Sequence, residues 1–128
     1  MMLARGIKVS GNTIQFYDKK TCGTCRKAKS YLDQLKIDYD LIDITKKTPP
    51  REILEKHMDE RGLKQYLNSR STIYREKGFS KNLPSKAEAI DLMLEHPDLI
   101  KRPVIIQGDR VLFGFDEGKI DELAGQTR

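Results

Sequence analysis

The alternation of apolar and polar residues predicts a strand over residues 13–17, in which Ile14 and Phe16 point the same way. Apolar residues then recur at the spacing of one helix face over residues 24–35, namely Ala28, Tyr31, Leu32 and Leu35. A second apolar run over residues 39–44 predicts another strand. Strand, helix and strand within about thirty residues make a β-α-β unit, whose two strands are expected to be parallel.

A block of helices is predicted for residues 48–97. Thr48 is expected to cap the first of them, with Pro49 and Pro50 in the first turn, where the missing N–H of proline is harmless. Gly62 is expected to end this helix, because glycine is a common C-terminal stop.

The rest of this block predicts three further helical pieces. Residues 63–78 suggest two short helices joined around residues 68–71. Ser85 and Glu88 have the spacing of a capping box, and His96-Pro97 ends the helix that follows them. That helix is expected to bury Ala87, Ile90, Met93 and Leu94.

The last third of the chain predicts a hairpin and a helix. Strands over residues 104–106 and 111–113 are separated by a turn at Gly108-Asp109. Asp116 can cap a final helix with Ile120 and Leu123 facing inward.

The predicted fold is therefore α/β. The element order is β-α-β, a helical insertion over approximately residues 48–97, and β-β-α, which together make a mixed sheet in a single domain over residues 1–128. Residues 7–9 could add a short strand, or the first residues could be a loose extension.

Composition narrows the classes of function. The 128 residues are 38% hydrophobic and 34% charged, with a net charge of +5. No apolar run approaches the ~20 residues that span a bilayer, and no export signal is recognisable, so we expect a cytoplasmic protein without membrane contact. Signatures of nucleic-acid-binding modules are missing, which argues against direct DNA binding.

The chemistry is expected at Cys22, just ahead of the first helix. Unpaired backbone N–H groups and the positive end of a helix dipole favour an anion there. Nearby acidic residues are Asp18 and Asp33, which are outnumbered by the basic residues Lys19, Lys20, Arg26, Lys27, Lys29 and Lys36. Both effects lower the pKa of the thiol, so the sequence predicts a reactive thiolate at Cys22.

Cys25 stands two residues further on, at the spacing of a local, reversible disulfide. In this interpretation Cys22 attacks as a thiolate, Cys25 displaces the adduct, and an outside thiol reduces the pair. Two alternatives remain open: half of a zinc site, or two inert thiols. Zinc needs further ligands, and His57 and His96 lack finger spacing, so we expect no metal and no bound cofactor, and structural roles for both histidines.

Three stretches of the chain, Cys22–Arg26, Leu67–Ser71 and Glu95–Val104, resemble the arsenate reductase (glutaredoxin-type) family. The same superfamily holds the Spx regulators and the YffB-like thiol reductases. The likeness extends from about Thr13 to Leu123, and the Glu95–Val104 stretch is more specific than the cysteine pair. It implies a thioredoxin-like fold with a helical insertion.

The resemblance also implies roles for single residues. Cys22 matches the family's nucleophile, and Arg70 and Arg102 look like two of three arginines that hold an oxyanion substrate. Without the resemblance, each arginine could equally be solvated or paired with a carboxylate. The third arginine is expected where this chain has Gly114.

The same likeness places other residues near the site. It implies a cis proline at Pro103, and we expect Thr24 and Arg26 to lie close by in structural roles. Family members of the reductase type have serine where this chain has Cys25, so the resolving thiol could here be internal.

Two functions follow from the resemblance. One is a thiol-disulfide oxidoreductase that acts on a small thiol substrate or an oxyanion such as arsenate, with glutathione and glutaredoxin, or thioredoxin, as external reductant. The other is an Spx-like redox-sensing regulator that binds the RNA polymerase alpha subunit, with the pair Cys22 and Cys25 as its switch.

Overall fold

The computed structural model describes residues 14–127, which form two compact units. Unit 1 contains residues 14–43 and 102–127, and unit 2 is Ile44–Lys101. Unit 2 matches the predicted helical insertion with slightly wider bounds. The strand considered for residues 7–9 lies outside the described residues, and the single domain over residues 1–128 stays a prediction.

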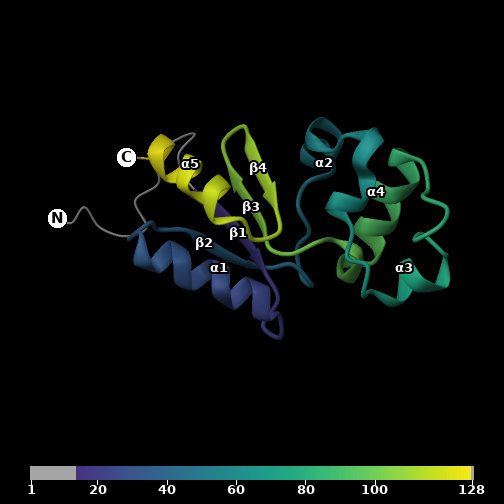
Figure 1. Ribbon diagram of the computed structural model, residues 1–128, viewed down its shortest axis with the longest axis horizontal. Helices are drawn as coiled ribbons and strands as arrows, with labels where there is room; N and C mark the ends of the chain where they lie inside the picture. Colours follow the sequence, from purple (N-terminus) through teal and green to yellow (C-terminus); the bar gives the residue numbers. More distant parts are fainter. Residues whose placement is uncertain (1–13, 128) are drawn as a thin grey trace. The chain divides into compact units, whose positions relative to one another are not determined.

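Unit 1 is built around a mixed four-stranded sheet (Figure 1). Its elements are β1 (Ile14–Asp18), α1 (Gly23–Gln34), β2 (Asp40–Asp43), β3 (Val104–Gln107), β4 (Arg110–Phe113) and α5 (Glu117–Thr127). The strand order is β2-β1-β3-β4. β1 pairs with β2 in parallel and with β3 antiparallel, and β3 and β4 form the expected hairpin. The predicted β-α-β and β-β-α orders are both confirmed.

The core of unit 1 lies between this sheet and the helices α1 and α5. Phe16 of β1 and Ile105 of β3 face it from the sheet, and both are fully buried. The helices contribute Cys25, Ala28, Leu32, Ile120 and Leu123. Asp116 accepts a hydrogen bond from the backbone N–H of Lys119 (3.2 Å), so the predicted cap of α5 is confirmed.

Unit 2 is helical, with one isolated bridge between Leu67 and Ile100. Its elements are α2 (Arg51–His57), the 3₁₀ helix η1 (Glu60–Tyr66), α3 (Thr72–Glu76), α4 (Lys86–Glu95) and the 3₁₀ helix η2 (Pro97–Leu99). η1 and α3 are the two short pieces predicted on either side of residues 68–71. Ser71 caps α3 by accepting the Tyr74 N–H at 3.2 Å.

Two details of α2 were predicted wrongly. Its N-cap is Pro50, which has an extended backbone and makes no side-chain capping bond, so Thr48 does not cap the helix. The helix also ends at His57 rather than at Gly62, which instead marks a kink inside η1.

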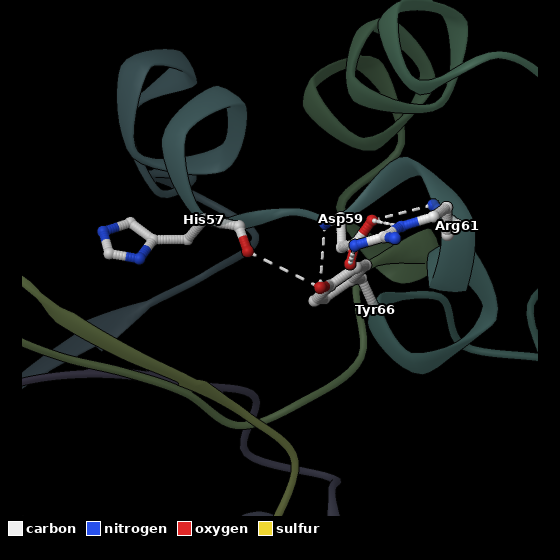
Figure 2. A network of polar contacts seen from close by, with 4 residues as sticks. All are labelled: His57, Asp59, Arg61 and Tyr66. Carbon is white, nitrogen blue, oxygen red and sulfur yellow. Dashed lines mark hydrogen bonds and ion pairs between the residues drawn. The ribbon is translucent and has the colours of Figure 1, made fainter.

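The early end of α2 is explained by contacts of Tyr66, shown in Figure 2. The Tyr66 hydroxyl donates to the backbone carbonyl of His57 (3.5 Å) and accepts the backbone N–H of Asp59 (2.9 Å). Asp59 then caps η1 by accepting the Arg61 N–H at 2.9 Å. These contacts satisfy backbone groups that would otherwise continue the helix.

The predicted cap of α4 is confirmed, but its buried face is shifted. Ser85 accepts the Glu88 N–H at 3.1 Å. Ala89, Ile90 and Met93 are buried, whereas Ala87 is exposed and Leu94 only half-buried. Within residues 14–127, no helix has the length and apolar character needed to cross a membrane.

Candidate functional site

Cys22 is the N-cap residue of α1, as predicted. Its backbone is extended, and its Sγ accepts the backbone N–H of Cys25 at 3.2 Å. Serine, threonine and aspartate usually supply this capping acceptor. Here a sulfur takes that place, so the helix itself holds the cysteine side chain in a fixed direction.

The loop before α1 is closed by contacts of its own. The Cys22 N–H donates to the Lys19 carbonyl at 2.9 Å, and the Arg26 side chain reaches back to the Lys20 carbonyl at 3.4 Å. This path brings the Arg26 guanidinium over Gly23. Arg26 thus lies beside the cysteine loop, as expected, and Thr24 is an exposed residue in the first turn of α1.

Cys25 differs from Cys22 in its burial and in the direction in which its pKa is shifted. Its side chain is 0% exposed and belongs to the core of unit 1, whereas Cys22 is half-buried. Burial first, and then the hydrogen bond to Cys22 and the charges of Cys22 and Asp18, raise the pKa of the Cys25 thiol to about 12. Cys25 therefore keeps its proton and donates it toward Cys22.

The pKa of Cys22 is lowered, as predicted. Burial alone would raise it, but hydrogen bonds from the Cys25 thiol and backbone N–H, together with the Arg102 guanidinium, hold it below the ordinary value. The positive charge acting on the sulfur is thus Arg102, in the loop before β3. The sequence pattern alone points instead to the basic residues around α1.

Arg102 is placed by the residues that follow it. The Arg102–Pro103 peptide bond is cis, as the resemblance implied, and Pro103 is buried. The Pro103 carbonyl accepts the Gly114 N–H at 2.8 Å, which ties the end of β4 to the start of β3. Gly114 has a φ of 88°, in the region that favours glycine.

Replacing Arg102 by methionine should raise the pKa of Cys22, because it removes a guanidinium that stabilises the thiolate. We expect alkylation by iodoacetamide to slow about threefold to tenfold at pH 7, and its pH profile to move to higher pH. A charge-assisted hydrogen bond contributes about 1.5–3 kcal/mol, and solvent around Cys22 reduces that. Arg110→Met, at an exposed site on β4, is the matched control; equal rates in both variants would contradict the role of Arg102.

Arg70 belongs to unit 2, in the loop between η1 and α3, and its side chain is exposed. Asn68 shapes that loop: its Oδ1 accepts the Arg70 N–H (3.0 Å), and its Nδ2 donates to the Asp98 carbonyl (3.0 Å). The sequence gives no signal for this role of Asn68 beyond the preference of asparagine for such turns. The oxyanion-binding role of Arg70 stays a prediction.

Both histidines also lie in unit 2, His57 at the end of α2 and His96 as the C-cap of α4. Within the described part of the chain, no cluster of three or more histidine, cysteine and acidic side chains could hold a metal ion.

A mixed sheet of this order, with a cysteine at the N-terminus of its first helix and a cis proline before β3, defines a thioredoxin-like protein. Its family follows from the sequence as a whole: the chain belongs to the ArsC family, whose model matches residues 17–123.

The proteins similar to this chain include an uncharacterised protein, a transcriptional regulator and a protein described as a possible arsenate reductase. The uncharacterised protein YusI of Bacillus subtilis is 33% identical over 114 residues, which cover 86% of this chain and 97% of YusI. The global transcriptional regulator Spx 2 of Bacillus cereus is 28% identical over 106 residues, 81% of each chain. The crystal structure of a "possible arsenate reductase" from Streptococcus mutans is 33% identical, with a TM-score of 0.73, over 85% of this chain and 98% of that one.

Proposed function

We propose that this protein is a thiol-disulfide oxidoreductase in which Cys22 is the nucleophile and Cys25 the resolving thiol. The observation that supports this most directly is the unequal pair. Cys22 caps a helix beside Arg102 with a lowered pKa, and Cys25 is buried next to it with its proton retained. This is the arrangement expected for attack by one sulfur followed by displacement by the other.

The reaction would run in two exchanges. The Cys22 thiolate attacks a disulfide and releases one thiolate, leaving a mixed disulfide at Cys22. Cys25 loses its proton and attacks the Cys22 sulfur, which releases the second thiolate and closes the pair. An external thiol, from glutathione with glutaredoxin or from thioredoxin, then reduces the pair.

A small disulfide is the substrate that the described residues favour over arsenate. A disulfide needs only an accessible thiolate, whereas an oxyanion needs several cationic donors. Arg102 acts on the Cys22 sulfur, but Gly114 occupies the position where the resemblance implies a third arginine. Arsenate reduction, with Arg102 as one ligand, is therefore the less favoured form of the proposal.

The test is turnover with defined reductants. A small neutral disulfide and arsenate are each offered, with glutathione and glutaredoxin or with thioredoxin, and Cys22→Ser is the blank. We expect turnover of the disulfide with at least one reductant, and a much slower reaction with arsenate. No turnover above the Cys22→Ser blank with any reductant would remove the proposal.

A second candidate function is redox-controlled binding to the RNA polymerase alpha subunit. The observation that favours it is the similarity to Spx 2 over 81% of both chains. Under this proposal the pair Cys22 and Cys25 sets the binding state. Capture of the alpha subunit's C-terminal domain by the oxidised or the reduced protein would support it, and the absence of capture in both states would exclude it.

A further inference from the structure

The positive charge of this protein is concentrated in one stretch of unit 2. Residues 61–86 contain seven of the 24 basic residues of the chain but only one of the 19 acidic residues, Glu76. The rest of the chain has slightly more acidic than basic residues, although the whole chain has a net charge of +5. The basic residues of this stretch are Arg61, Lys64, Arg70, Arg75, Lys77, Lys81 and Lys86. Cys22 and Arg102, on which the proposed reaction depends, belong to unit 1.

The loop between α3 and α4 holds two of these lysines, and η1 brings a third to it (Figure 1). The Gly78 carbonyl accepts the backbone N–H groups of Lys81 and Asn82, both at 3.0 Å, which folds the start of the loop into a tight turn. The Nζ of Lys64 donates to the carbonyl of Ser80 at 3.3 Å, so η1 lies against that turn. The three lysines around the turn, here called the lysine cluster, are Lys64, Lys77 and Lys81.

The lysine cluster has no acidic partner within residues 14–127. All three side chains are exposed, and none of them forms an ion pair there. Glu76 precedes Lys77 in the chain, but it is exposed and pairs with none of the three. By contrast, Arg51 of the same unit contacts Asp91. A group of like charges without a counter-charge produces a positive potential that attracts anionic partners.

An exposed leucine stands near the end of the same loop. Leu83 is 41% exposed, and among the large apolar residues in the described part of the chain it shares this exposure only with Leu41 of β2. Phe79, near the start of the loop, is buried, and its ring centroid lies 5.9 Å from that of Tyr74. The loop is therefore anchored at Phe79. Leu83 follows Lys81 by two residues, so a partner that meets the cation can also meet the leucine.

Leu83 distinguishes between the classes of anionic partner. Lysine ammonium groups pair with carboxylates and with phosphates, so the lysine cluster alone fits either a protein or a nucleic acid. An exposed leucine gains free energy when an apolar side chain covers it, whereas the phosphate backbone of a nucleic acid is charged. A lipid surface binds in proportion to the apolar area that it buries, and one leucine supplies little of it. The combination favours a protein.

We propose that the lysine cluster and Leu83 form a binding surface for an acidic segment of another protein. Carboxylates of that segment pair with the lysines, and one of its apolar side chains covers Leu83. Binding involves no covalent change and does not require Cys22 or Cys25. The inference goes beyond the proposed function and does not depend on it.

The experiment measures the binding of fluorescent peptides to the whole protein by anisotropy. One peptide consists of glutamates interspersed with leucines, and a second peptide of equal length and charge has serine in place of each leucine. We expect tighter binding of the leucine peptide. We also expect affinity to fall steeply between about 50 mM and about 300 mM salt, because exposed charges are screened.

Substitution of the lysines tests where the peptide binds. Changing Lys77→Gln together with Lys81→Gln should weaken binding about threefold to tenfold, since exposed ion pairs contribute modestly. The matched control is Lys46→Gln together with Lys47→Gln, which changes two exposed lysines before α2 and has the same effect on net charge. It should change the affinity by less than about twofold. Equal losses in both double variants would overturn the proposal.

Substitution of the leucine tests the apolar contact. Leu83→Ser should weaken binding of the leucine peptide about threefold to tenfold, because covering a half-exposed leucine removes apolar area from water. It should leave binding of the serine peptide unchanged. Leu41→Ser, at the other exposed leucine, is the matched control and should affect neither peptide. Equal affinity of the two peptides, or no binding of either, would exclude the proposed surface.

Two other anions complete the test. Duplex DNA or vesicles of anionic lipid, if bound more tightly than the leucine peptide and weakened by the change at Lys77 and Lys81, would assign the surface to a nucleic acid or a membrane and overturn the proposal. Cys22→Ser removes the proposed reaction but should bind the leucine peptide normally, so the two proposals can fail separately.

Discussion

Replacing Cys22 by serine is expected to abolish reaction with disulfides, whereas Cys25→Ser should still react once and then stop. The reason is the difference between the two sulfurs. Cys25 is 0% exposed, and because burial raises its pKa to about 12, it is rarely ionised at pH 7. It therefore cannot replace Cys22 as the attacking group. Serine is a good helix N-cap, so Cys22→Ser should keep the start of α1.

The measurement is the mass of the intact protein after incubation with a neutral hydroxyalkyl disulfide. Unaltered protein should lose the mass of two hydrogens, Cys25→Ser should gain one hydroxyalkyl thiol, and Cys22→Ser should keep its mass. A mixed disulfide formed readily by Cys22→Ser would show that Cys25 is accessible, and it would overturn the assignment of the two roles.

Replacing Phe16 by alanine is expected to lower the free energy of unfolding by about 3–5 kcal/mol, the range found for large aromatic truncations in cores. Phe16 is fully buried in the middle of β1, and its ring centroid lies 5.4 Å from that of Tyr39. It packs in the same core cluster as Cys25, so its loss opens a cavity in that core. Urea unfolding followed by circular dichroism measures the change.

Leu41→Ala is the matched control, because Leu41 is the register partner of Phe16 on β2 and yet is 56% exposed. Truncating an exposed residue should change stability by only about 0.5 kcal/mol. Similar losses in both variants would mean that the described burial of Phe16 does not determine the stability of this unit.

The parts of the fold with strong local signals were predictable. The alternation around Ile14 and Phe16, the turn at Gly108-Asp109 and the cap at Asp116 all depend on residues close in sequence. The misses depend on distant partners. The end of α2 is set by the Tyr66 hydroxyl, which lies nine residues beyond His57 in the chain and gives no periodic signal.

The residues of the candidate site can also be divided into those that local sequence predicts and those that depend on distant parts of the chain. Cys22 as a helix cap follows from the local change from strand to helix. Only the family resemblance points to Arg102 as a residue of the site, because some eighty residues separate it from Cys22 and no local pattern joins them. Asp18 was missed as a buried group because a carboxylate at the end of a strand is usually solvated; its burial appears only once α1 packs and brings Lys29 to it.

The backbone conformation at Gly114 restricts which side chains this position can carry. An L-amino acid in the left-handed region costs about 1–2 kcal/mol, and Gly114 has a φ of 88° while its N–H holds the Pro103 carbonyl. Introducing arginine at this position would strain the segment that positions Arg102, the cation already acting on the nucleophile. A variant with an added arginine at this position would need a different backbone conformation at the end of β4. The ligands of this protein are therefore restricted by its main chain as well as by its side chains.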